Sequence, residues 1–84
     1  MNTHKTYLTD VGIQKLTDEL TELTEKQRPE LAKRLREAIK MGDLSENADY
    51  IAAKEDQAFI EGRILELQEM LRSSVLISDQ TSKQ

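Results

Sequence analysis

The chain of 84 residues contains no cysteine, one proline, one histidine and three glycines. Without cysteine, a disulfide scaffold, a thiol nucleophile and a zinc site with sulfur ligands are excluded. The lone His4 stands in a polar stretch, which argues against a Ser-His-Asp triad or a histidine-rich metal site. Aromatic residues make up 4% of the chain, and a chain this short cannot bury a thick core. The sequence therefore predicts one small, elongated domain.

Long apolar runs are also missing, since none approaches the ~18 residues that a membrane span needs, and no secretory signal opens the chain. We therefore expect a cytoplasmic protein without a membrane partner. The net charge of -4 differs from the basic excess of a generic nucleic-acid binder. Bases gather between Lys26 and Lys40 and acids between Asp43 and Arg72, so the two halves should attract, and any contact with nucleic acid must be local.

Apolar residues recur at steps of three and four in two segments, the pattern of amphipathic helices. The first helix is predicted from about residue 10 to 41, after a cap at Thr9 or Asp10, and the second from about 47 to 72. Gly42 suits the left-handed position that ends a helix. Because a short connection makes long helices antiparallel neighbours, the predicted fold is all-α, a long antiparallel two-helix coiled-coil hairpin with its functional tip at residues 42–47.

The register of this hairpin predicts which residues meet across the seam. The predicted pairs are Leu16 with Leu71, Leu20 with Leu67, Leu23 with Ile64, Gln27 with Ile60, Leu31 with Gln57 and Leu35 with Ala53. Ile39 and Tyr50 continue the two apolar faces toward the tip. The same register brings the basic stripe of Lys26, Lys33, Arg36 and Lys40 near the acids of the second helix, so interhelical ion pairing is one explanation of that stripe.

Three features interrupt the pattern. Pro29 lies inside the first helix and predicts a kink, because it has no N–H for the carbonyl of Glu25. Gly62 in the second helix suggests a local bend or a close approach. The β-branched run 75–77 has no evident partner strand, so it either packs on the hairpin base near Tyr7 or begins a further domain.

The segment from Gly42 to Tyr50 places several carboxylates at the far end of the rod. Asp43 and Glu46 have the spacing of a capping box, in which both side chains bond backbone N–H groups at the start of the second helix. Alternatively, they project from the tip and hold a hard divalent cation such as Mg²⁺, with a partner completing the ligand set.

For three residues near these acids, the sequence allows a functional role beside a purely structural one. Leu44 is apolar in an exposed turn, which suits a tip that enters another molecule. Tyr50 either covers the end of the core or presents its ring and hydroxyl to a nucleotide. Lys54 is either a solvated lysine or a phosphate contact.

The stretch from Gly42 to Tyr50, followed by Ala52-Ala53-Lys54-Glu55 and by residues 59–64, resembles the signature of the bacterial Gre transcript-cleavage factors. Leu8-Thr9, Gly12, Lys15-Leu16, Glu19-Leu20 and Arg28-Pro29-Glu30 are similar to the first helix of that family. The resemblance covers about residues 7–77. It implies a transcription elongation factor domain, with DNA-binding among its properties, that is not itself an enzyme.

The resemblance further implies that the hairpin enters the secondary channel of bacterial RNA polymerase and stimulates cleavage of the 3′ end of backtracked RNA. Asp43 and Glu46 would be the catalytic tip acids, sharing a Mg²⁺ ion with the polymerase. The implied RNA or phosphate contacts are Lys54, Lys40 and Arg36, although Ile39 stands where the family has a base. The implied tip contacts are Leu44, Ser45, Asn47 and Tyr50.

By the same resemblance we expect an N-terminal extension over 1–8, the hairpin over 9–74, and a tail over 75–84 that begins an absent C-terminal FKBP-like domain. Two other functions remain open from the residues. One is an inhibitor that occupies the polymerase channel without stimulating cleavage, and the other is a generic coiled-coil interaction module. The exposed apolar Phe59, Leu65 and Met70 lie off the seam and could pack on the absent domain, a second copy or the edge of the first helix.

Overall fold

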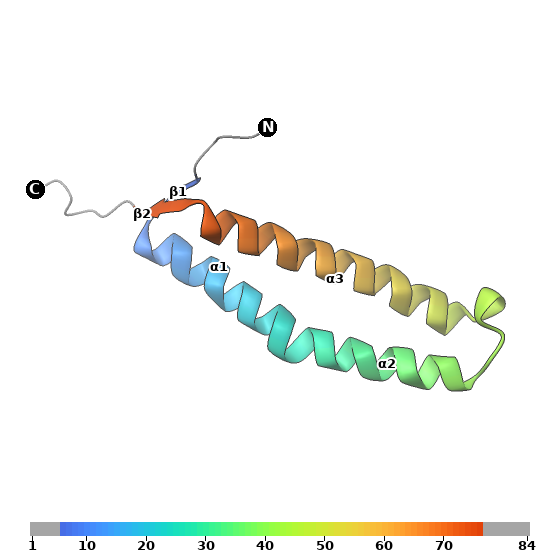
Figure 1. The fold of residues 1–84 in the computed structure, drawn as a ribbon. Helices are drawn as coiled ribbons and strands as arrows, with labels where there is room; N and C mark the ends of the chain where they lie inside the picture. The colour runs from blue at the N-terminus through green and yellow to red at the C-terminus, as the bar shows by residue number, and fades with distance from the viewer. Residues whose placement is uncertain (1–5, 77–84) are drawn as a thin grey trace, which may run out of the picture.

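The computed structural model describes residues 6–76, and over this range the chain is a long helical hairpin (Figure 1). The first arm consists of α1 (Asp10–Glu22), the π-helical turn η1 (Leu23–Gln27) and α2 (Arg28–Lys40). Thr9 caps α1, because its Oγ1 accepts a hydrogen bond from the Gly12 N–H at 3.1 Å. The predicted cap and the predicted extent of the first helix are confirmed.

The second arm is the single helix α3 (Ala48–Arg72), which follows the short 3-10 turn η2 (Leu44–Glu46). The two arms lie side by side and antiparallel, and the rod measures 62 × 29 × 13 Å. The predicted all-α hairpin is therefore confirmed. No helix within residues 6–76 is both long enough and apolar enough to cross a membrane.

The core is one seam of side chains between the arms. The buried members of this cluster are Leu23, Leu31, Ala53, Ile60, Ile64 and Leu67, with Leu16, Leu20 and Leu35 packed against them. All nine were predicted from the spacing. Ile39 was not predicted correctly, because it is 50% exposed and Ala38, 2% exposed, takes the seam position nearest the tip. After Leu35 the seam advances by three residues rather than four, which places Ala38 and not Ile39 against α3.

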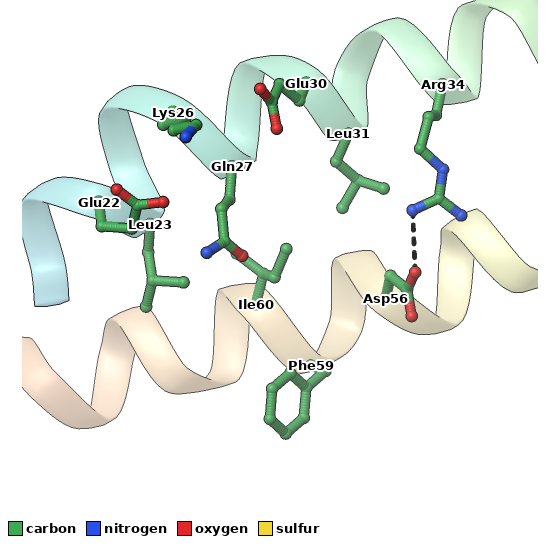
Figure 2. A pocket seen from close by; sticks show the side chains of 10 residues that line it. All are labelled: Glu22, Leu23, Lys26, Gln27, Glu30, Leu31, Arg34, Asp56, Phe59 and Ile60. Carbon is green, nitrogen blue, oxygen red and sulfur yellow. Dashed lines mark hydrogen bonds and ion pairs between the residues drawn. The ribbon is translucent and has the colours of Figure 1, made fainter.

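Among residues 6–76, three ion pairs join the arms on either side of this seam. Arg28 pairs with Glu61 through two hydrogen bonds of 2.8 and 2.7 Å, and Arg63 pairs with Glu19 through bonds of 2.7 and 2.9 Å. Arg34 and Asp56 form the third pair at 2.9 Å (Figure 2). The hydrogen bond from Arg28 lowers the pKa of Glu61, and the bond from Arg63 lowers that of Glu19.

These pairs do not use the basic stripe that was predicted to make them. Within residues 6–76, the stripe residues Lys26, Lys33, Arg36 and Lys40 form no ion pair. Lys33 lies two positions from both Leu31 and Leu35, and Lys40 lies two positions from Ala38. At 3.6 residues per turn, two positions correspond to about 200° around the helix. Lys33 and Lys40 therefore face away from α3, whereas Lys26 lines a groove between the arms with Phe59 and Ile60 but forms no ion pair there. The ion-pair explanation of the stripe is wrong.

The predicted kink in the first arm takes the form of the π-helical turn. Figure 1 shows the arm changing direction between α1 and α2. In this turn the Arg28 N–H reaches back five residues to the Leu23 carbonyl, and Pro29, which has no N–H to donate, follows among the first residues of α2. The Thr24 hydroxyl also donates to the Leu20 carbonyl at 2.9 Å, a contact that tends to bend helices.

Gly62 causes no comparable break. It lies inside α3, which continues without interruption from Ala48 to Arg72. A Cβ atom built on Gly62 would meet nothing within 4 Å, so no neighbouring element requires a glycine there. The predicted bend or close approach at Gly62 is wrong.

The base of the hairpin holds a short parallel ladder between β1 (Thr6–Leu8) and β2 (Ser74–Leu76). Tyr7 pairs with Val75 and Leu8 pairs with Leu76. The predicted packing of this run on the hairpin base near Tyr7 is confirmed for residues 75 and 76. The interpretation that the sequence holds no partner strand was wrong, because that strand lies just before the first helix. Of the predicted run, Ile77 lies outside the described residues, as do 1–5 and 78–84.

Candidate functional site at the hairpin tip

The turn between the arms is built from two consecutive residues in the left-handed conformation. Gly42 has φ of 78°, as predicted for a residue that ends a helix, and Asp43 follows with φ of 52° and ψ of 55°. Aspartate tolerates this region better than most residues, but it is still an uncommon position for any side chain. The backbone conformation therefore fixes the direction of Asp43 at the extreme end of the rod.

The capping box predicted for Asp43 and Glu46 does not form. Asp43 makes no capping hydrogen bond, and the cap of α3 is Asn47, whose Oδ1 accepts from the Tyr50 N–H at 2.9 Å. The physical reason is that an N-cap residue has an extended backbone, which Asn47 adopts directly before α3, whereas Asp43 is left-handed. The bond from the Glu46 N–H goes instead to the Asp43 carbonyl, at 3.0 Å.

Asn47 also ties the two arms together. Its amide Nδ2 donates to the carbonyl of Ala38 at 2.8 Å and to that of Gly42 at 3.2 Å. These are carbonyls at the end of the first arm, so one side chain satisfies groups on both helices. Sequence reasoning named Asn47 only as a tip contact. The signal that could have found its structural role is an asparagine directly before a helical pattern.

The two tip carboxylates are consequently uncommitted. Asp43 and Glu46 are both exposed, and neither side chain makes a hydrogen bond or an ion pair with any residue in the described range. Carboxylate oxygens are hard ligands, and one or two of them suffice for a Mg²⁺ ion whose other ligands are water and phosphate. Within residues 6–76, no three acidic or histidine side chains gather as a metal-binding group. The donor set thus fits a cation shared with another molecule.

The other predicted tip contacts surround these acids. Leu44 is 40% exposed and Ser45 is exposed on the same 3-10 turn. Tyr50 is half-buried one turn into α3. Its hydroxyl forms no hydrogen bond within the described part of the chain, while its backbone N–H is held by Asn47. The tip therefore presents an apolar side chain beside two carboxylates.

The predicted basic contacts lie on two different surfaces. Lys40 and Arg36 are exposed on the outward side of α2 with Lys33, and we call these three residues the outer α2 face. Lys54 lies on α3, where its Nζ donates to Gln57 Oε1 at 2.9 Å. The structure therefore brings Arg36 and Lys40 together but places Lys54 on the other arm.

The fold and the tip define a class of protein, a helical hairpin module that presents uncommitted carboxylates at the end of a narrow rod. The chain belongs to the family whose model is described as "Transcription elongation factor, N-terminal", which matches residues 6–76. This result confirms the resemblance to the Gre factors.

Individual relatives agree with the family match. The chain is 50% identical over 80 residues to the transcription elongation factor GreA of Bacillus cereus, covering 94% of this chain and 51% of the relative. It is 49% identical over 83 residues to the GreA protein of Mycoplasma genitalium, covering 99% of this chain and 52% of the relative. The chain spans about half the length of the curated relatives it matches.

Proposed function

We propose that this hairpin enters the secondary channel of bacterial RNA polymerase and stimulates cleavage of the 3′ end of backtracked RNA. The observation that carries the proposal is the pair of exposed, uncommitted carboxylates of Asp43 and Glu46 at the end of a 62 Å rod. Two helices side by side are narrow enough to follow a channel. The polymerase remains the nuclease, because a rod with a single layer of side chains offers no enclosed active site.

Asp43 and Glu46 would complete the coordination of a Mg²⁺ ion shared with the polymerase, and such an ion supplies charge stabilisation and an activated water in phosphoryl cleavage. The contribution of this chain is positioning. Asp43 is held by its left-handed backbone, and Glu46 is held by the 3-10 turn that its N–H closes onto the Asp43 carbonyl. Groups fixed before the reaction avoid the entropy cost of orienting them during it.

The basic side chains would hold the RNA. Arg36 and Lys40 lie on the outer α2 face, and their charge is available because the ion pairs between the arms use Arg28 and Arg34 instead. Lys54 on α3 provides a further cation near the tip. A phosphate backbone would be attracted to these residues despite the net charge of -4.

The test is cleavage of end-labelled RNA in stalled, backtracked polymerase complexes, with the variant Asp43→Asn, Glu46→Gln beside the wild-type chain. We expect the variant to lose about 100-fold or more of the stimulated rate, the scale of removing an electrostatic group at a reacting centre. Asparagine tolerates the left-handed region, so the helical circular dichroism should be unchanged. Raising Mg²⁺ should restore part of the lost rate.

The matched control is Asp49→Asn, which removes an exposed acid from the first turn of α3 without touching the turn itself. This control should keep the wild-type rate. Equal cleavage by the wild type and the double variant would contradict the proposal. A wild-type chain that occupies the channel without cutting RNA would instead identify a channel inhibitor.

A further inference from the structure

Asn47 is connected to both tip acids. Glu46 is its neighbour in the chain, and its amide Nδ2 donates to the carbonyl of Gly42 at 3.2 Å. That carbonyl belongs to the peptide group that joins Gly42 to Asp43, and a peptide group is planar and rigid. A hydrogen bond to this carbonyl therefore restrains the backbone directly before Asp43.

The amide of Asn47 is itself held in one orientation. Its Nδ2 also donates to the carbonyl of Ala38 at 2.8 Å, and its Oδ1 accepts from the Tyr50 N–H at 2.9 Å. Turning the amide over would place Oδ1 against two carbonyl oxygens and Nδ2 against an N–H, so only one orientation satisfies all three contacts. The half-buried side chain of Asn47 is therefore fixed at both ends of its amide.

The bonds from Asn47 attach the tip turn to the end of the first arm. Inside the turn, the Glu46 N–H donates to the Asp43 carbonyl at 3.0 Å, and this bond does not reach the first arm. In the described part of the chain, no hydrogen bond other than the two from Asn47 Nδ2 joins residues 38–42 to residues 44–50. Without these two bonds, the turn that carries both carboxylates is free to rotate against the end of α2.

The left-handed backbone of the turn also needs such a restraint. Gly42 has φ of 78° and Asp43 has φ of 52°. A residue other than glycine keeps a left-handed conformation only where the surrounding structure determines it. The Gly42 carbonyl stands between these two residues, so the bond that it accepts from Asn47 stabilises the conformation of both.

We propose that Asn47 is a positioning residue for the stimulated cleavage, because its amide fixes the backbone that carries Asp43 and Glu46. The inference rests on the proposed function, since it concerns the same two acids. Two carboxylates that share one Mg²⁺ ion need a fixed separation and direction, and groups that orient metal ligands typically change affinity or activity about 10- to 100-fold. In this role Asn47 acts through the backbone of the turn rather than by contact with RNA or the ion.

The first measurement uses the chain alone, without polymerase. Asn47→Ser keeps an oxygen that can cap α3 but lacks the amide that reaches the two carbonyls. We expect the backbone ¹⁵N order parameters of residues 43 and 46 to fall from about 0.85, the rigid range, to below about 0.6, while circular dichroism stays helical. The matched control is Thr9→Ala, which deletes the cap of α1 at the opposite end of the rod and should leave both order parameters unchanged.

The second measurement is the RNA cleavage assay at a saturating concentration of the chain, with Mg²⁺ titrated. Asn47→Ser should lower the maximal stimulated rate about tenfold and raise the Mg²⁺ concentration that gives half of it. The concentration of chain that half-saturates the polymerase should stay at the wild-type value. Thr9→Ala should keep the wild-type rate and Mg²⁺ requirement, because excess chain overcomes a general loss of stability.

The outcomes separate this inference from the proposed function. Unchanged order parameters in Asn47→Ser, an unchanged maximal rate, or an equal loss of rate in Thr9→Ala would each overturn the positioning role. In all three cases the Asp43→Asn, Glu46→Gln variant still decides the proposed function. If the wild-type chain stimulates no cleavage, the proposed function fails and the positioning role fails with it.

Discussion

At the scale of single residues, the tip depends on Asn47, which serves two helices with one side chain. Replacing Asn47 by alanine removes the cap of α3 and leaves the Ala38 carbonyl without its side-chain donor. We expect a loss of about 1–2 kcal/mol in the free energy of unfolding, the usual cost of deleting a capping side chain. Urea denaturation followed by circular dichroism would measure it.

Asn47→Ser is the matched control, because serine is also a good cap but cannot reach the Ala38 carbonyl. It should recover most of the loss that Asn47→Ala causes. Equal stability of the wild type and Asn47→Ala would show that the cap and the cross-arm bonds contribute nothing. The sequence could not decide between this cap and the Asp43-Glu46 capping box, since both spacings are allowed. The left-handed backbone at Asp43 decides it, and backbone angles are not visible in residue identity.

At the scale of elements, α3 is helical throughout although it contains Gly62, a residue of low helix propensity. Gly62→Ala should raise the free energy of unfolding by about 0.5–1 kcal/mol, because alanine has the better helix propensity and its Cβ meets open space. For a domain of this size, 1 kcal/mol corresponds to a rise of roughly 4–8 °C in Tm. Thermal unfolding followed at the helix signal would detect it.

Gly42→Ala provides the contrast, because φ at Gly42 is 78° and a side chain there is strained. It should lower the free energy of unfolding by about 1 kcal/mol. If both alanine variants shifted Tm in the same direction, helix propensity and backbone strain would not be the governing causes.

Periodicity predicted the two arms and nine seam residues because apolar spacing directly reports which helix face is buried. The kink near Pro29 was also predicted from a local cause, because proline has no backbone N–H to donate to the preceding turn. The β1–β2 ladder escaped prediction because its strands are three residues each and lie at opposite ends of the described chain. The residue pattern singled out the tip acids and left both capping and cation binding open, and the resemblance implied their catalytic role. Their freedom from capping bonds became visible only in the structure.

At the scale of the whole molecule, acid should weaken the attachment of the two arms. Hydrogen bonds from Arg28 and Arg63 lower the pKa values of Glu61 and Glu19 below 4.5 in the folded chain. The stability that these pairs contribute is therefore present above about pH 4.5 and is lost as pH falls through the lowered values. Tm measured between pH 7 and pH 3 should decrease most steeply below pH 4.5.

The variant Glu19→Gln, Glu61→Gln isolates these two carboxyls from the other acids. Its Tm should be lower than that of the wild type at neutral pH, and the difference should shrink toward pH 3. Both pairs are partly exposed, so added salt should also reduce the difference at neutral pH. A difference that stays constant from pH 7 to pH 3 would show that the ion pairs do not join the arms in solution.

The parallel ladder at the base has a mechanical consequence. Because β1 and β2 run in the same direction, tension applied before Thr6 and after Leu76 pulls the two strands along their length in opposite senses. The backbone hydrogen bonds between the strands are then loaded together in shear, rather than opened one after another as in a zipper. A pull on the ends of the described chain would meet this resistance first, before it reached the seam between the helices.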